Sequence, residues 1–122
     1  MSADAPKTLL RIEVAREFSE LPFGRYPRHG PNNGERFRED FLVPGLRNFD
    51  EVVVNLTGTR GLAPSFLEES FGGLVRVGFT EPELRAHLTI ENSDTSYVLD
   101  SWSYIEEEQR KQDLASDTAG LA

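Results

Sequence analysis

One segment limits the fold more than any other: a strand pattern at Glu51–Leu56, a loop at 57–64 and a helix pattern at 65–77. Three consecutive valines make the first part the strongest strand signal in the chain. A nearly continuous apolar strand is typical of a strand buried on both faces of an α/β sheet. Ser65 and Glu68 have the spacing of a capping box at the helix start. Because open α/β sheets place their working surfaces at the carboxyl ends of the strands, we expect the functional site near Ser65.

The rest of the chain alternates strand and helix patterns around this segment. Strand patterns occupy 8–14 and 85–91, and helix patterns occupy 35–48 and the residues from Thr95 onward. This order favours parallel strand pairing through helical connections. It predicts a small α/β sandwich with a three- to four-stranded, mostly parallel sheet and helices packed against it.

Single residues indicate where several of the predicted elements begin or end. Pro44 is expected to kink or end helix 35–48, because proline lacks the amide hydrogen that the helix needs. Gly78 is well placed to end helix 65–77 in a left-handed conformation. Thr80 and Pro82 are typical of the start of a short helical turn over 80–84, just before the third strand.

The chain of 122 residues has the length of one domain. We expect a flexible amino terminus at 1–7, a single domain at 8–108 and a flexible polar tail at 109–122. Residues 1–7 lack the apolar core of a signal peptide, and no apolar run approaches the length of a membrane span. Together with the absence of cysteine, this predicts a cytoplasmic protein with no membrane contact.

The charge balance bears on the class of partner. A net charge of −8 repels phosphate backbones, so we expect no nucleic acid partner. The basic side chains between Pro22 and Phe41 are expected to be solvated or paired with nearby acids rather than to bind nucleic acid. The basic residues are Arg25, Arg28, Arg36 and Arg38, and the acids are Glu35, Glu39 and Asp40.

The residues offer little for catalysis. The two histidines, His29 and His87, are far apart in sequence, and no metal-binding or nucleophile motif is present. Glu68 and Glu69 are adjacent and are expected to point to different sides of a helix, so they do not form an acid/base pair. We therefore expect a protein that is not an enzyme, with no cofactor and no metal.

The hydroxyl groups around the loop leave two interpretations open. Ser65 is either a structural helix cap or a regulated hydroxyl at the positive end of a helix. Thr57 and Thr59 are expected to make hydrogen bonds within the turn. The run Gly58–Gly61 with Arg60 could also form an anion-binding nest, although it lacks the spacing and the lysine of a phosphate-binding loop.

Four segments of the chain carry a family resemblance: Phe18–Tyr26 with its Pro-Phe-Gly-Arg-Tyr, Gly34–Pro44 with its Gly-Glu-Arg-Phe-Arg-Glu, Val52–Gly58 and Pro64–Leu74. Together they resemble the STAS-like domains of unknown function, which are bacterial and phage relatives of the anti-sigma-factor antagonist and sulfate-transporter domain. The resemblance covers roughly Leu9 to Trp102, and the strand-to-helix part is its most specific portion.

The resemblance implies a regulatory role for the loop. In the antagonist family the strand ends in Asp-Leu-Ser, and the following helix begins with Asp-Ser-Ser-Gly. The second serine of that helix start is phosphorylated by a kinase that is itself the anti-sigma factor. Asn55, Leu56 and Thr57 match the first motif, and Ser65 falls on the phosphorylated serine. The flanking positions differ from the second motif: they are Ala63, Pro64 and Phe66.

The wider STAS-like group is often encoded beside or fused to histidine-kinase-type ATPases, which implies a protein partner of that kind. We therefore expect a non-enzymatic regulatory module, with a role in signalling or transcription regulation, that binds a kinase-type ATPase or an anti-sigma-like regulator. Its predicted contact residues are Thr57, Gly58, Thr59, Arg60, Ser65, Phe66, Glu68 and Glu69.

Two alternatives remain open at this stage. The loop from Thr57 to Gly61 could bind a nucleotide or another small ligand through Arg60. Gly72 and Gly73 could instead form a flat helix face through which two copies of the chain pack as a homodimer.

Overall fold

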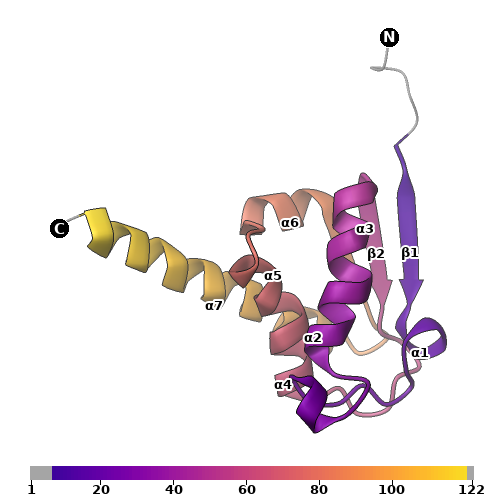
Figure 1. The fold of residues 1–122 in the computed structure, drawn as a ribbon. Coiled ribbons are helices and arrows are strands. Elements are labelled where there is room, and N and C mark those ends of the chain that lie inside the picture. Colours follow the sequence, from indigo (N-terminus) through magenta and orange to yellow (C-terminus); the bar gives the residue numbers. More distant parts are fainter. Residues whose placement is uncertain (1–6, 121–122) are drawn as a thin grey trace.

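Three parallel strands form one sheet in the computed structural model, which describes residues 7–120 (Figure 1). They are β1 (Leu9–Glu13), β2 (Glu51–Asn55) and β3 (Leu88–Glu91), and their order in the sheet is β1-β2-β3. Ile12, Val54 and Ile90 lie in one row across the three strands. The predicted α/β class and the parallel pairing are confirmed.

The helices connect and follow these strands. Two of them each run through a central π-helical segment, so that 34–48 and 64–76 are continuous helices. The segments are α1 (Val14–Glu17), η2 (Pro27–His29), α2 (Gly34–Phe37), η3 (Arg38–Leu42), α3 (Val43–Asn48), α4 (Pro64–Leu67), η4 (Glu68–Gly72), α5 (Gly73–Arg76), α6 (Glu81–His87) and α7 (Thr95–Gly120).

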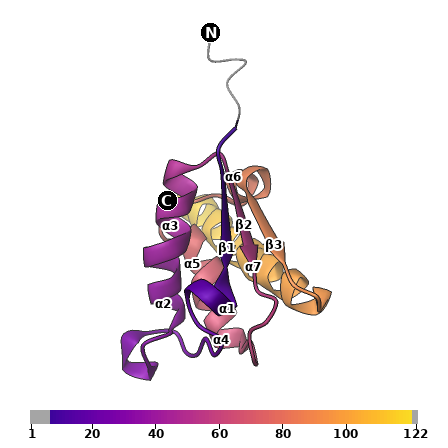
Figure 2. The ribbon, with the colours of Figure 1, turned by 90° about the vertical axis from the view of Figure 1, so that its right-hand side faces the viewer.

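Apart from the short α1, the helices labelled in Figures 1 and 2 lie on one side of the sheet. The side chains facing them are buried, whereas Val53 in the middle of β2 is only half-buried. The prediction that β2 is buried on both faces is therefore wrong. Consecutive valines suit any pleated strand, so their presence does not require a second covering layer. The buried strand residues are Ile12, Val52, Val54, Leu88 and Ile90.

A polar ladder occupies the open face of the sheet. Arg11 Nε donates to Glu13 at 2.6 Å, and Arg11 Nη2 reaches Glu91 at 2.8 Å on the far strand. Arg11 and Val53 are register partners, so the arginine crosses β2 to reach β3. This charged face is suited to water and needs no second layer of helices.

The predicted strand at 85–91 is only partly confirmed, because residues 85–87 belong to α6. The Thr80 hydroxyl accepts from the Glu83 amide, and the Glu83 carboxylate accepts from the Thr80 amide, which completes a capping box. Leu84 is fully buried beneath this helix. Thr80 therefore caps the helix α6, which is nearly two turns long, where the sequence predicted only a short turn. The strand begins after this helix, at Leu88.

Helix 34–48 passes through Pro44 without ending. The π-helical segment at Arg38–Leu42 widens the turn before the proline, and the amide of Val43 bonds to the carbonyl of Arg38. That extra residue in the turn accommodates a ring that would otherwise collide with the preceding turn. The prediction that Pro44 ends the helix is wrong.

Gly78 behaves as predicted at the end of helix 64–76. Its φ of +118° lies in the region that favours glycine. The Phe79 amide donates to Leu74 O at 3.0 Å and the Gly78 amide to Val75 O at 3.1 Å, the pairing of a Schellman motif.

Helix α7 is longer than the sequence suggested. It runs from Thr95 to Gly120, so residues 109–120 are helical where a flexible polar tail was predicted, and its last turns project away from the sheet (Figure 1). Residues 1–6 and 121–122 of the predicted flexible ends lie outside the described residues. Across residues 7–120, no helix combines the length and the apolar character that crossing a bilayer requires.

Candidate functional site

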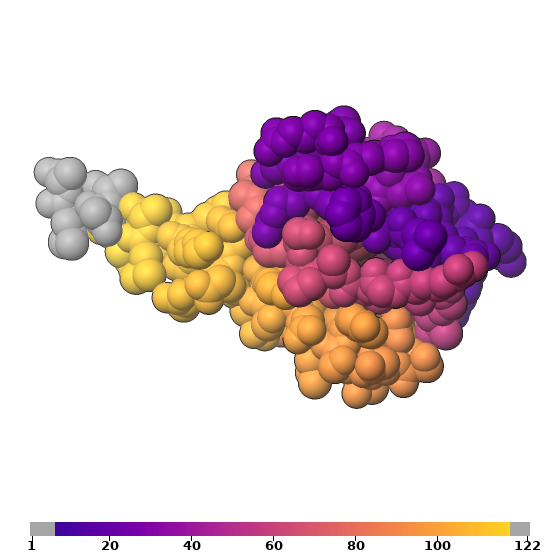
Figure 3. Space-filling view, turned by 90° about the horizontal axis from the view of Figure 1, so that it is seen from below, coloured from indigo at the N-terminus to yellow at the C-terminus, as the bar shows by residue number. Residues whose placement is uncertain are grey.

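Three connecting segments meet at the carboxyl edge of the sheet: 18–33, 56–63 and 92–94. Figure 3 looks onto this edge and shows segments of these three colours, purple, pink and orange, side by side. Hydrogen bonds join neighbouring segments. The Arg60 amide donates to Glu20 O at 2.7 Å, and the Ser93 amide donates to the Thr57 hydroxyl at 3.1 Å. The edge is therefore a continuous surface built from distant parts of the chain.

The loop after β2 is exposed, as the sequence suggested. Gly58 has a φ of +93° and Gly61 a φ of +71°, so both turns of this loop need left-handed residues. The Thr59 hydroxyl donates to Leu56 O at 2.7 Å. Arg60 is exposed and pairs with Glu20 at 3.2 Å across the loops. Thr59 makes the predicted hydrogen bond within the turn, whereas the Thr57 hydroxyl accepts instead from Ser93 in another segment. The side chain that pairs with Arg60 is Glu20 of this protein.

Ser65 is not the helix cap. The N-cap is Ala63, Pro64 occupies the first helical position and Ser65 the second. Proline is favoured at that first position because its fixed φ suits a helix start, which moves the boundary two residues before the predicted one. The Ser65 hydroxyl is half-buried and makes no hydrogen bond within residues 7–120. A capping role therefore does not account for this hydroxyl.

A shallow cavity of about 290 Å³ opens beside Ser65. Its other lining residues are Phe23, Gly24, Arg25 and His29, all from the segment that precedes α2. His29 Nδ1 accepts from the amides of Arg25 at 3.2 Å and Tyr26 at 3.1 Å. Because Nδ1 is an acceptor, the proton of the neutral ring is on Nε2. The cavity thus presents a cationic, an imidazole and a hydroxyl group together.

Phe66 and Glu69 were predicted to contact a partner, but the structure buries them. Phe66 is 0% exposed and lies 5.8 Å from Phe37 and 6.2 Å from Phe18, centroid to centroid. Glu69 is 5% exposed. Neither side chain is available at the surface, so a contact surface at this edge must be built from other residues.

Glu69 is buried because Arg38 is buried with it. Arg38 is 6% exposed, and its Nη1 donates to both Glu69 Oε2 and Glu69 O at 2.7 Å. Gly73 makes room for this guanidinium, since a Cβ there would lie 2.3 Å from Arg38 Nη1. Gly72 packs against Glu68 and the backbone of Tyr104 in α7. The two glycines are therefore buried inside the protein and do not form a free face for a homodimer.

Glu68 is half-buried between two arginines. It pairs with Arg25 by a short contact and with Arg76 at 2.8 Å. Both arginines also approach Glu69, Arg25 at 3.6 Å and Arg76 at 3.5 Å. The prediction that the two adjacent carboxylates point to different sides is therefore wrong. Two arginines reach both carboxylates, so neighbouring positions on the helix do not keep these side chains apart.

This pairing makes the protein sensitive to acid. Burial disfavours the charged form of Glu68, but hydrogen bonds from Arg76 and Arg25 outweigh it and hold the pKa of the carboxyl below its ordinary 4.5. A lowered folded-state pKa contributes stability at neutral pH that is lost as the pH falls through that pKa.

We therefore expect Glu68→Gln to be less stable than the wild type at pH 7, with a difference that shrinks as the pH falls below 4.5. Urea midpoints measured across this range would show it, with Glu107→Gln on the exposed side of α7 as the control. A difference that is independent of pH would contradict the role of the ionised carboxylate.

The sequence located the loop and Ser65 at this edge but missed Phe23, Arg25 and His29. A signal was present, because Pro22–Tyr26 is one of the segments that carry the family resemblance. The spacing of that segment does not indicate that it folds back beside Ser65.

Comparison with known proteins gives one match. A family model described as a STAS-like domain of unknown function matches residues 33–98, which include the second strand, its loop and the helix that carries Ser65. No match was found among curated proteins or among solved structures.

Proposed function

The chain belongs to the family of STAS-like domains of unknown function, and we propose that it is a non-enzymatic module that binds another protein through its carboxyl edge. The proposed surface consists of the loop residues Thr57, Gly58, Thr59 and Arg60 together with Ser65 and its cavity. Leu21 and Phe23 extend it with apolar area.

One observation carries this proposal: the aromatic side chain of Phe23 is exposed beside Ser65, and Leu21, two positions earlier in the chain, is exposed as well. Leu21 is 56% exposed and Phe23 is 63% exposed, in a segment that is otherwise anchored by hydrogen bonds. Phe23 also lines the cavity beside Ser65. Exposed aromatic side chains near the centre of a surface patch are typical of the residues that contribute most to protein–protein binding.

The proposed partner is a histidine-kinase-type ATPase, as the family resemblance implies. The chemistry around Ser65 supports control by phosphorylation. A phosphate on its hydroxyl would lie at a helix start beside Arg25 and His29. It would compete with Glu68 for Arg25, because these two side chains already form a short ion pair. Phosphorylation would thereby change the charge of the surface and the pairing of the residues beneath it.

The test is binding to a histidine-kinase-type ATPase from the same genome, measured by calorimetry with purified proteins. We expect Phe23→Ala to weaken binding at least about tenfold, because an exposed aromatic anchor is lost. Ser65→Asp should also weaken or strengthen binding measurably, while Leu114→Ala on the distant part of α7 should leave it unchanged. The proposal would be contradicted if the wild type does not bind the ATPase. It would also be contradicted if both Phe23→Ala and Ser65→Asp bind with the affinity of the wild type.

A further inference from the structure

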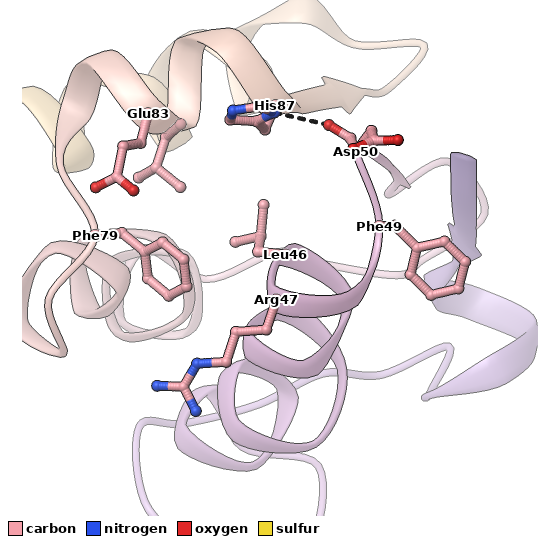
Figure 4. Close-up of a pocket in the computed structure, with 8 residues that line it drawn as sticks. Leu46, Arg47, Phe49, Asp50, Phe79, Glu83 and His87 are labelled. Atoms are coloured by element: carbon pink, nitrogen blue, oxygen red, sulfur yellow. Dashed lines mark hydrogen bonds between the residues drawn. The ribbon is translucent and has the colours of Figure 1, made fainter. Parts of the chain in front are cut away.

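A second cavity, of about 270 Å³, lies at the opposite, amino edge of the sheet (Figure 4). It is bounded by the carboxyl ends of α3 and α6 and by the loop around Phe79. Leu46, Phe79 and Leu84 supply its apolar wall. A neighbouring hollow of about 200 Å³ shares Arg47, Phe79 and Glu83 with it. The larger hollow, at about 270 Å³, lies just below the range of about 300 to 1,000 Å³ that is typical of ligand pockets.

The two carboxylates in the cavity are already engaged. Asp50 Oδ2 accepts from the Thr8 amide at 2.9 Å and from the Thr8 hydroxyl at 3.2 Å. Glu83 Oε1 accepts from the Thr80 amide at 2.9 Å and from the Thr80 hydroxyl at 3.1 Å, within the capping box of α6. These hydrogen bonds fix one oxygen of each carboxylate within the fold, although both groups keep their negative charge. An anionic group of a ligand must therefore bind at Arg47.

Arg47 provides a positive charge that can bind an anionic group of a ligand. Most arginines of residues 7–120 form ion pairs or stack on rings, but Arg47 makes no ion pair, hydrogen bond or ring contact there. Arg16, at the other edge of the sheet, is the second such residue within this range. Arg47 is exposed and lines both hollows, so its guanidinium can take a planar anion in a bidentate manner.

His87 supplies a hydrogen-bond acceptor. Its Nδ1 lies 2.7 Å from Asp50 O, and a carbonyl can only accept, so Nδ1 carries the proton. In the neutral ring Nε2 is then a free acceptor. Figure 4 shows His87 and Arg47 on opposite sides of Leu46, with Phe79 to one side and the Arg47 side chain extending away from His87.

We propose that this cavity binds a small aromatic carboxylate that also carries a hydroxyl group. The carboxylate pairs with Arg47, the ring packs against Phe79 and Leu46, and the hydroxyl donates to His87 Nε2. This site is separate from the protein-binding edge, because it lies at the other ends of the strands and shares no residue with the surface around Ser65.

The test uses 4-hydroxybenzoate as the probe and the full chain, labelled for amide NMR. We expect saturable binding with a Kd of about 1 mM or tighter, with shifts at Phe79 and His87 and none at Thr57 and Ser65. Titration without saturation, or shifts centred on the carboxyl edge, would overturn the proposal.

Variants assign the contacts. Arg47→Gln should weaken binding about tenfold or more, because a charge-assisted pair is lost, whereas Arg16→Gln should bind like the wild type. Phenol, which lacks the carboxylate, should bind weakly to every variant. Benzoate should bind the wild type more weakly than 4-hydroxybenzoate, and His87→Phe should remove that preference. Equal affinity of wild type and Arg47→Gln, with amide spectra that show both folded, would overturn the proposed role of Arg47.

Discussion

Replacing Arg38 with methionine should lower the free energy of unfolding by about 3 to 5 kcal/mol, the range found when one partner of a buried ion pair is removed. Arg38 is 6% exposed and Glu69 is 5% exposed, so water does not replace the lost guanidinium. The substitution also removes the donor from Glu69 O, which Arg38 Nη1 reaches at 2.7 Å. Urea unfolding followed by circular dichroism measures the loss.

Two further variants separate the charge from the packing. Arg110→Met removes an exposed pair, at 2.5 Å from Glu107, and should cost less than about 1 kcal/mol. Arg38→Met combined with Glu69→Met should regain most of the stability, because apolar replacement of both partners leaves no charge buried. A double variant as unstable as the single one would show that hydrogen bonding and shape, rather than an uncompensated charge, dominate at this site.

The parts of the fold that local chemistry determines were predictable from sequence. The β2 strand, the left-handed Gly78 and the Thr80 cap depend on residues within a few positions of one another. The parallel order of the strands also followed, since each strand is separated from the next by a helix pattern. The local conformational preferences of these residues agree with the tertiary contacts that the folded protein makes at the same positions.

Other features depend on contacts between distant segments and were not predictable in the same way. Helix 64–76 contains a π-helical segment at Glu68–Gly72, and Arg25 and Arg76 each approach both Glu68 and Glu69. Arg38 determines that Glu69 is buried, although the two residues are 31 positions apart. A helical pattern assumes regular spacing, so it cannot indicate an extra residue in one turn.

The candidate site was predicted in position but not in composition. The loop from Thr57 to Arg60 lies at the carboxyl edge and is accessible, which follows from its place after a parallel strand. Phe66 is one of the residues that the sequence predicts to contact a partner. Its partners Phe18 and Phe37 come from earlier elements, and only their packing together shows that it belongs to the core.

Gly73→Ala should destabilise the protein by about 2 kcal/mol, although alanine is the better helix former by roughly 1 kcal/mol. The added Cβ would lie 2.3 Å from Arg38 Nη1 and 3.1 Å from Arg38 Cζ. The guanidinium must therefore move, and its two hydrogen bonds to Glu69 weaken. Thermal and urea unfolding of the purified variant would measure the loss.

The neighbouring Gly72→Ala is the matched comparison. Its Cβ would meet Glu68 Oε2 at 2.6 Å and Tyr104 O at 3.3 Å, so Glu68 must shift from its pair with Arg76. We expect a loss of about 1 kcal/mol that does not depend on Arg38. If Gly73→Ala acts by displacing Arg38, its cost should largely disappear in the Arg38→Met, Glu69→Met background, where no guanidinium remains to be displaced. A cost that is the same in both backgrounds would mean that Gly73 is required by the backbone of the helix and not by the buried arginine.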